Sequence, residues 1–299
     1  MLKTRVIPVL LWKDVTLIKG IGFDSWRRIG TLMPAIKVFN ARCVDELILL
    51  NITATNDGLP PDYEIISELS PECFVPLTVG GGIREVEHIR RLLLAGADKV
   101  AINTAAVECP EIIREGAERF GSQCIVVSID ARRAHMEPDE TVSSSRLTDV
   151  SLTGPIVPPP LNTDRQSFRA QPSGKGVYEC YTHSGTRPTG LSPVDLAVQA
   201  ESYGAGEILV TSIERDGTMT GYDLDLIKSI TEAVKIPVIA GGGAGSYEHL
   251  YQAIVTGGAS AVAAGAMYQF TEQTPLAAKD YLSQRGIPVR RSNLKPIHT

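Results

Sequence analysis

Two glycine-rich stretches, "PLTVGGGIREVEHI" at residues 76–89 and "PVIAGGGAGSYEHL" at residues 237–250, decide the expected fold of this chain. In each of them a short apolar run leads into a glycine triplet and then into an amphipathic segment. This order predicts a buried strand, a tight turn and a covering helix, which together form a β/α unit. Because the two stretches resemble each other, we expect the chain to contain the same unit twice.

The repeat extends beyond these two stretches. "DELILLNITAT" at residues 45–55 resembles "AGEILVTSIER" at residues 205–215. The same offset of 161 residues separates three matching pairs, which are Glu46 and Glu207, Gly82 and Gly243, and His88 and His249. A duplicated half-barrel explains a constant offset, whereas an open sheet does not need one.

Apolar, β-branched runs alternate with amphipathic segments along the whole chain. The apolar runs predict strands near residues 6–11, 46–51, 76–80, 98–102, 123–130, 206–212, 236–240 and 260–264. The amphipathic segments predict helices over residues 61–70, 85–96, 110–121, 193–204, 223–234, 246–258 and 275–286. This alternation predicts a parallel α/β sheet closed into a (β/α)₈ TIM barrel, with an open doubly wound sheet as the alternative.

One segment breaks the alternation. Residues 134–176 are rich in Ser, Thr, Pro and Gly and lack apolar periodicity, which predicts a loop or disordered insertion after the fifth strand. Loops that follow barrel strands lie on the catalytic face, so the insertion is expected near the site. "VYECYTHSG" at residues 177–185 alternates as a small hairpin does. We expect residues 1–299 to form a single barrel that carries this insertion.

The composition of the chain argues against several classes of protein. The net charge of −5 argues against a general nucleic-acid-binding surface. The five cysteines are scattered and form no CxxC pair, which argues against a disulfide framework or a metal site and predicts a reducing cytoplasm. The N-terminus lacks a signal-peptide pattern, and no apolar run reaches the roughly 18 residues of a spanning helix, so no membrane partner is expected. No cofactor is expected either.

Glycine triplets after strands can offer backbone N–H groups to an anion. "VGGGI" at residues 79–83 and "AGGGAG" at residues 240–245 each precede a helix, whose positive end adds to the attraction. Tight strand–helix turns also favour glycine for purely structural reasons. The occurrence of two matching triplets favours anion binding over that structural explanation.

Further candidate anion-binding residues follow neighbouring predicted strands. "INTAAV" places Asn103 and Thr104 before a helix, and "AAGAMY" places Ala264 and Gly265 at the equivalent position of the second half. We therefore predict two phosphate sites and a doubly phosphorylated ligand. The candidates are Gly82, Asn103 and Thr104 in one site, Gly243 and Gly265 in the other, and Asp216 and Gly217 in the polar loop "ERDGTMTGYD".

Asp130 closes the buried run "VVSIDARR". An acid at the carboxyl end of a barrel strand is well placed for general acid–base catalysis. The structural alternatives are a helix cap or a partner for Arg132 or Arg133.

Strand parity gives a prediction for the other end of the barrel. Residues two apart on a strand share a face, so Arg5 shares one with Leu11, and Lys99 shares one with Asn103. If Leu11, Asn103 and Asp130 point into the lumen, two cations and two anions meet at its floor as a neutral ring. Its members are Arg5, Glu46, Lys99 and Glu207. The alternative is that these charges only mark solvent-exposed strand starts.

At this point the chain resembles a known family, the cyclase subunit of imidazole glycerol phosphate synthase. The resemblance covers nearly the whole chain except the insertion. The stretches that carry it are "ADKVAINTAAVECP" (97–110), "FGSQCIVVSIDARR" (120–133), "GAGEILVTSIERDGTMTGYD" (204–223) and "IAGGGAGSYEH" (239–249).

The resemblance implies a (β/α)₈ barrel that binds a bisphosphorylated ribonucleotide and docks a glutaminase subunit on its N-terminal face. Ammonia from the glutaminase would pass a charged gate formed by the four residues of the floor ring and attack the nucleotide. Asp98 matches the acid that faces the partner, Lys19 the flexible-loop lysine, and Asp130 one of two catalytic acids. The two phosphate sites match at the residues already named.

The first strand departs from the family pattern, which closes it with an aspartate. Here that position is Leu11, and a leucine cannot transfer a proton. Asn51, where the pattern has Asp, and Gly241, where it has Ser, are milder departures. "RVIPVLLWKD" (5–14), "SPECFVPLTVGGGI" (70–83) and "GASAVAAGAMYQF" (258–270) resemble a paralogous branch that accompanies a glutaminase and a sugar amidotransferase in surface-polysaccharide biosynthesis.

Three functions follow as hypotheses. The first is a glutaminase-coupled, ammonia-channelling barrel that supports amidation of a nucleotide sugar. The second is a true cyclase of histidine biosynthesis in which Asp14 or Asp130 serves alone. The third is a non-catalytic scaffold or allosteric subunit that binds a phosphorylated ligand and a glutaminase. Leu11 separates the second hypothesis from the other two.

Overall fold

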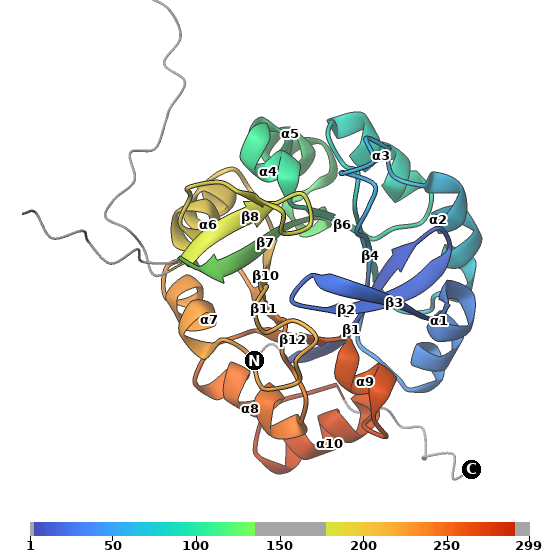
Figure 1. Ribbon diagram of the computed structural model, residues 1–299, viewed down its shortest axis with the longest axis vertical. Helices are drawn as coiled ribbons and strands as arrows, with labels where there is room; N and C mark the ends of the chain where they lie inside the picture. Colours follow the sequence, from blue (N-terminus) through green and yellow to red (C-terminus); the bar gives the residue numbers. More distant parts are fainter. Residues whose placement is uncertain (1–2, 135–177, 291–299) are drawn as a thin grey trace, which may run out of the picture.

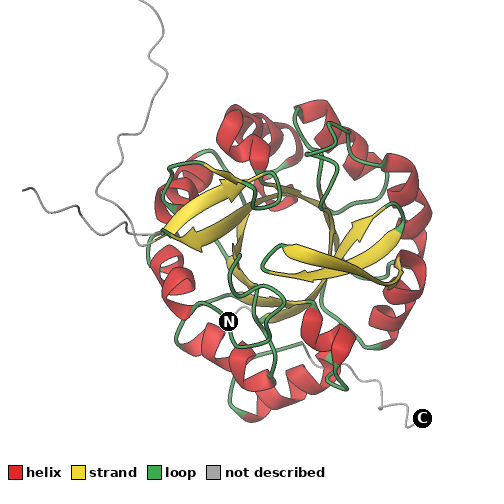
Figure 2. Ribbon diagram, viewed as in Figure 1, coloured by secondary structure: helices red, strands yellow, loops and turns green. Residues whose placement is uncertain are grey.

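The computed structural model describes residues 3–134 and 178–290, and these residues include a closed barrel of eight parallel strands (Figures 1 and 2). The strands, in chain order, are β1 (Arg5–Lys13), β4 (Leu47–Asn51), β5 (Leu77–Gly80), β6 (Lys99–Ile102), β7 (Ile125–Arg133), β10 (Glu207–Ser212), β11 (Val238–Gly241) and β12 (Ala261–Ala264). The barrel is closed because β12 pairs with β1 and β10 pairs with β7. The eight predicted strands and the TIM barrel are confirmed, and the open sheet is excluded.

Helices surround the barrel on the outside (Figure 2). The longer ones are α1 (Leu32–Ala41), α2 (Tyr63–Leu69), α3 (Val86–Leu94), α5 (Glu111–Phe120), α6 (Pro193–Ser202), α7 (Leu224–Thr231), α8 (Tyr247–Val255) and α10 (Pro275–Gln284). Short helical turns are α4 (Thr104–Glu108), α9 (Ala266–Phe270), η1 (Ser70–Glu72) and η2 (Ser122–Cys124). All seven predicted helices are present, and α1, α4 and α9 are additional.

Helix α1 was not predicted because its sequence, LMPAIKVFNA, has too few polar residues to show a clear amphipathic pattern. It nevertheless buries Leu32, Ile36 and Phe39, which are spaced as one helical face requires. Burying side chains of this size contributes roughly 1.5–3 kcal/mol each. Tertiary packing therefore stabilises a helix that the sequence pattern alone leaves ambiguous.

Alternate side chains of the strands pack on opposite sides of the sheet. One set packs against the helices, and the other fills the middle of the lumen as a separate inner cluster. The members of this inner cluster are Ile7, Ile48, Ala101, Val126, Leu209, Ile239, Ala261 and Ala263. This apolar layer divides the lumen into two ends, and polar groups are confined to those ends.

Two antiparallel hairpins extend over the barrel mouth from opposite sides (Figure 1). Strand β1 continues into β2 (Thr16–Ile21) and β3 (Asp24–Thr31), whereas β7 pairs with β8 (Tyr178–Thr182), which pairs with β9 (Arg187–Pro188). The β8–β9 hairpin confirms the one predicted at residues 177–185. The β2–β3 hairpin was not predicted. Each half of the barrel thus carries a hairpin associated with its first strand.

The predicted insertion, apart from Ala134, lies outside the described residues, so its placement over the site stays a prediction. In the part of the chain that the structure describes, no helix is both long and apolar enough to cross a bilayer.

Candidate functional site

Four charged side chains close the floor of the lumen, where the parallel strands begin. A guanidinium nitrogen of Arg5 lies 2.7 Å from Glu46 Oε2 and 3.0 Å from Glu207 Oε1. Lys99 Nζ lies 3.0 Å from Glu46 Oε2 and 3.2 Å from Glu207 Oε1. Each cation thus contacts both carboxylates, and the ring is neutral. The parity argument is confirmed in its geometry, and the alternative of separate solvated charges is wrong.

The two carboxylates of the ring stabilise the charged form of Arg5. Burial alone lowers the pKa of Arg5, but the carboxylates of Glu207 and Glu46 outweigh it, and the pKa is raised. Glu46 is almost fully buried and also accepts a hydrogen bond of 2.7 Å from the hydroxyl of Thr78. Opening the floor therefore requires at least one of these charged contacts to be broken.

Asp98 directly precedes Lys99, the first residue of β6, and is exposed at the N-terminal end of the barrel. Its carboxylate accepts a hydrogen bond of 2.8 Å from the backbone N–H of Leu77. This bond ties together the starts of two neighbouring strands. The role of Asp98 at a partner interface stays a prediction.

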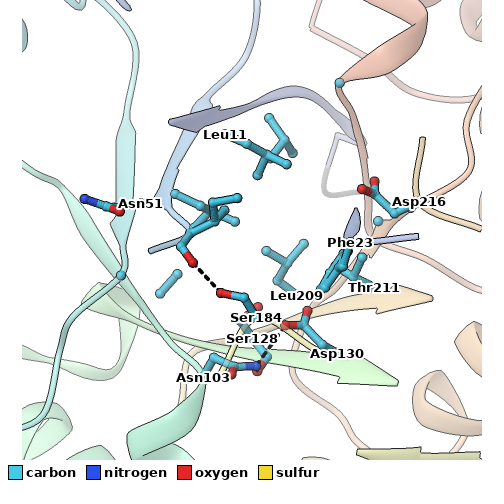
Figure 3. A pocket seen from close by; sticks show the side chains of 18 of the residues that line it. Leu11, Phe23, Asn51, Asn103, Ser128, Asp130, Ser184, Leu209, Thr211 and Asp216 are labelled. Atoms are coloured by element: carbon cyan, nitrogen blue, oxygen red, sulfur yellow. Dashed lines mark hydrogen bonds between the residues drawn. The ribbon is translucent and has the colours of Figure 1, made fainter. Parts of the chain in front are cut away.

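A cavity opens at the other end of the lumen, where the strands end and the two hairpins approach (Figure 3). Every strand of the barrel, or the loop directly after it, contributes to its lining. One such residue from each of the eight strand ends is Leu11, Leu50, Gly81, Asn103, Asp130, Thr211, Gly241 and Gly265. The cavity is therefore at the end of the barrel where TIM-barrel active sites are found.

Asp130 lies on the inward face of β7 at the cavity wall (Figure 3). Asn103 Nδ2 donates hydrogen bonds to Asp130 Oδ2, at 3.2 Å, and to the carbonyl of Ser128, at 3.0 Å. Burial, with a further contribution from the carboxylate of Asp216, raises the pKa of Asp130 to about 7. A carboxyl group with this pKa can both donate and accept a proton near neutral pH.

The structural alternatives for Asp130 are not supported. Arg133 pairs instead with Asp223 and Asp225, at 3.7 and 3.5 Å. Arg132 lies over the ring of Tyr181, 5.0 Å from its centroid. Asp130 itself lies within β7, where it caps no helix.

Leu11 lies across the cavity from Asp130 (Figure 3). It is 7% exposed and pairs in register with Leu50 of β4. Together with Val9 these side chains form an apolar wall. The cavity thus has an ionisable group on one side and hydrocarbon on the other.

Lys19 is not on a loop, as the resemblance implies, but in strand β2 of the hairpin over the mouth. It is buried, and its Nζ lies 3.3 Å from Asp216 Oδ1. The carboxylate of Asp216 is thus the counter-ion of Lys19 and lines the cavity with it. Its part in ligand binding stays a prediction.

The first group of candidate phosphate residues is brought together at one side of the cavity. Gly82, Asn103 and Thr104 all line it. Gly82 has a φ of 76°, and a methyl group there would lie 2.7 Å from the carbonyl oxygen of Leu59, so glycine is required. The hydroxyl of Thr104 accepts a hydrogen bond of 3.2 Å from the backbone N–H of His183 in the β8–β9 turn.

The second group is only partly assembled as predicted. Gly265 lines the cavity next to Lys19, but the cavity lining contains Gly241 and Gly242 rather than Gly243. Gly243 supports the loop from behind, where its carbonyl accepts a hydrogen bond of 2.8 Å from the N–H of Gly221.

Two further details of the predicted phosphate-binding residues differ from the structure. Gly217 packs its backbone against the carbonyl of Gly20 in the β2–β3 hairpin and does not line the cavity. The repeat is also shifted by one residue at the end of the fourth strand of each half. Asn103 and Gly265 both precede the short helices and adopt similar backbone angles, so Gly265 matches Asn103 rather than Thr104.

Comparison with known protein families agrees with this geometry. The family described as "Histidine biosynthesis protein" matches residues 5–272, which include every strand of the barrel. This chain belongs to that family. Its members include isomerases and cyclases, and enzymatic activity fits this family member.

Several cavity residues of this family member were missed from the sequence. Phe23 and Trp26 come from the unpredicted β2–β3 hairpin, Asn51 is the last residue of β4, and Thr55 comes from the loop after it. Ser184 comes from the β8–β9 turn, and its hydroxyl donates a hydrogen bond of 2.5 Å to the carbonyl of Ile52. The glycines and aromatics of "TLIKGIGFDSWRRIGT" at residues 16–31 are a signal from which the first hairpin could have been predicted.

Proposed function

We propose that this barrel is a cyclase-like subunit that receives ammonia from a glutaminase partner and delivers it to a phosphorylated ligand in the cavity. The observation that carries the proposal is the arrangement of one lumen. A closed ring of partly buried charges lies at its floor, and a cavity with an ionisable acid lies at its mouth. A barrel that only binds a ligand at its mouth has no need of a charged ring at its floor.

The layer between the two ends suits neutral ammonia. It is built from aliphatic side chains, and Ala101, Ala261 and Ala263 are small. Moving an ammonium ion through such a layer is costly because it loses its water, whereas neutral ammonia loses much less. In this proposal Lys99 moves aside to admit ammonia, because its flexible side chain closes the ring from one side.

The cavity would bind the ligand between its two glycine loops and place it beside Asp130. The phosphate sites stay a proposal, supported by the approach of Gly82, Asn103 and Thr104 at one side and of Gly242 and Gly265 at the other. Asp130 would move protons, since its pKa of about 7 lets it alternate between acid and base.

Leu11 favours a reaction other than the ring closure of a true cyclase, because that chemistry needs carboxylates on both sides of the lumen. Asp14 cannot replace the missing acid, since it lies exposed in the tight turn between β1 and β2 with a φ of 47°. We therefore propose that the barrel supports amidation of a nucleotide sugar, in a complex with a glutaminase and a sugar amidotransferase. The non-catalytic scaffold remains the second candidate, favoured by the same apolar wall.

The first experiment supplies the purified protein with the bisphosphorylated ribonucleotide of the cyclase reaction and saturating ammonium salt, without a glutaminase. We expect the ribonucleotide to bind without being consumed. Turnover at the rate of a genuine cyclase would contradict the assignment and place the protein in histidine synthesis. Absence of binding would contradict the phosphate sites.

The second experiment tests ammonia passage with Lys99→Met and the cognate glutaminase. We expect product formation from glutamine to change strongly, while formation from external ammonium salt stays the same, because only the first route crosses the floor ring. Lys37→Met is the matched control, since Lys37 is an exposed lysine of α1. If glutamine-driven product formation is the same in both variants, ammonia does not pass through the ring.

A further inference from the structure

His88 and His249 occupy the same place in the two halves of the barrel. Each lies in the first turn of a helix, α3 or α8, that follows a glycine loop of the cavity. His88 Nδ1 accepts a hydrogen bond of 3.3 Å from the backbone N–H of Arg84, and His249 Nδ1 accepts one of 3.2 Å from the N–H of Gly245. In both cases the ring reaches back to the residue four positions earlier.

These contacts require the Nδ1 atoms to carry no proton. In the first half, His88 Nε2 lies 3.2 Å from Glu85 Oε1, and a ring that donates a proton from Nε2 to this carboxylate leaves Nδ1 free to accept. In the second half, the ring of His249 packs over Gly221, where a methyl group would lie 3.6 Å from Cδ2. Gly221 in turn donates a hydrogen bond to the carbonyl of Gly243.

Each imidazole therefore fixes the exit of one glycine loop. Gly81 and Gly82 lie two to three residues before Arg84, and Gly242 lies three residues before Gly245; all three glycines line the cavity and have positive φ. Glycines are the most flexible residues of a backbone, so an anchor directly behind them limits how their N–H groups are oriented.

We propose that His88 and His249 are positioning residues, one for each anion-binding loop of the cavity. By accepting a hydrogen bond from the loop exit, each histidine holds the preceding glycine N–H groups in the orientation in which they bind a phosphate group. The inference rests on the proposed function, because it assumes that the loops bind phosphate.

The test measures phosphate binding at each loop separately. Inorganic phosphate is titrated into the ¹⁵N-labelled full chain at about pH 8, where an ordinary imidazole is neutral. The amide shifts of Gly82 and Gly242 report the two loops. The variants are His88→Leu and His249→Leu, which remove the acceptor, and His88→Asn and His249→Asn, whose Oδ1 takes the place of Nδ1.

We expect His88→Leu to weaken phosphate binding about tenfold at Gly82 and to leave Gly242 unchanged, and His249→Leu to do the reverse, in line with the loss of one hydrogen bond. The Asn variants should bind within about twofold of the wild type, since they keep the acceptor. Because the Asn variants retain the backbone contact, they remain informative if a Leu variant fails to fold.

Two other outcomes are distinguishable. If the wild type shifts neither glycine, the phosphate sites themselves are wrong, and the proposed function fails together with this inference. If the wild type binds phosphate at both loops, the inference is overturned by unchanged affinities in the Leu variants, by equal losses at both loops, or by Asn variants that bind as weakly as Leu. Each of those results would leave the histidines as ordinary helix-capping groups.

Discussion

The two halves of the barrel share their frame and differ in the chemistry of their strand ends. Glu46 matches Glu207 in the floor ring, and the glycine loops and their histidines match as well. At the end of the first strand of each half, however, one half has Leu11 and the other has Asp130. The strands and helices of the two halves maintain the fold, whereas the residues at the strand ends line the cavity. Residues at the strand ends can therefore differ between the halves without changing the fold.

The residues that follow the fourth strand also differ between the two halves. Asn103 directly follows the fourth strand of the first half, and Gly265 directly follows that of the second half. Asn103 orients Asp130 by a hydrogen bond, whereas Gly265 leaves room for Lys19. Asp130, its orienting amide and the Lys19–Asp216 pair are thus arranged asymmetrically around the cavity, within a symmetric frame.

The largest expected effect comes from placing an acid at the end of the first strand, where the first half has a leucine. We expect Leu11→Asp to raise ammonium-driven consumption of the cyclase ribonucleotide by about 100-fold over the wild type, because it supplies the second proton-transfer group. The measurement is the rate of substrate loss. Leu11→Asn is the control of equal size that does not titrate, and equal rates for the two variants would contradict the interpretation of Leu11.

The two carboxylates of the floor ring should differ in their effect on stability. Glu46 is the more deeply buried and has Thr78 as an additional partner. We expect Glu46→Ala to lower the free energy of unfolding by about 4 kcal/mol and Glu207→Ala by about 2 kcal/mol, since each leaves Arg5 and Lys99 with fewer partners. Urea unfolding measures both values, and equal losses would show that the halves contribute equally to the floor.

Asp130 should make the stability of the protein depend on pH. Its pKa is about 7 in the folded chain and about 3.8 in the unfolded chain, so between these values the folded chain binds more protons. Stability therefore falls as the pH rises from about 4 to about 7 and is level above that. We expect the free energy of unfolding of Asp130→Asn, relative to that of the wild type, to be about 4 kcal/mol higher at pH 8 than at pH 4.

This prediction is checked by unfolding both proteins across that pH range. The two proteins differ only in a carboxyl group or an amide at position 130. The difference between their curves of stability against pH therefore reports the titration of that carboxyl group. Parallel curves would contradict the buried, proton-binding state of Asp130.

The smallest expected effects are on stability, and they come from substitutions in the glycine loops of the two halves. A methyl group at Gly243 would lie 2.2 Å from the carbonyl oxygen of Gly221, and one at Gly82 would lie 2.7 Å from that of Leu59. We expect Gly243→Ala to cost about 2–3 kcal/mol of stability and Gly82→Ala about 2 kcal/mol. Gly58→Ala is the control, because Gly58 also has positive φ but meets no atom within 4 Å, and it should cost about 1 kcal/mol. Thermal or urea unfolding that ranks Gly58→Ala highest would contradict the close approaches.

Much of the site could be predicted because it depends on short-range rules. The inward positions of Arg5, Lys99 and Glu207 follow from the two-residue period of a strand. The inward position of Asp130 follows from the same rule. Residues whose place depends on a turn or on a distant partner were harder to predict. Lys19 was expected on a loop because the β2–β3 hairpin was not identified, and the ion pair between Lys19 and Asp216 was not predicted.

The sequence by itself determined the barrel, its duplicated halves, the charged floor and the contrast between Leu11 and Asp130, because periodicity, glycine placement and strand parity are local properties. Only the tertiary structure decided which of these residues meet. Lys19 and Asp216 are 197 positions apart, and they are paired because closure of the barrel brings a hairpin of the first half onto a loop of the second. Contacts of this kind depend on the pairing of β7 with β10 and on hairpin packing, which no local pattern encodes.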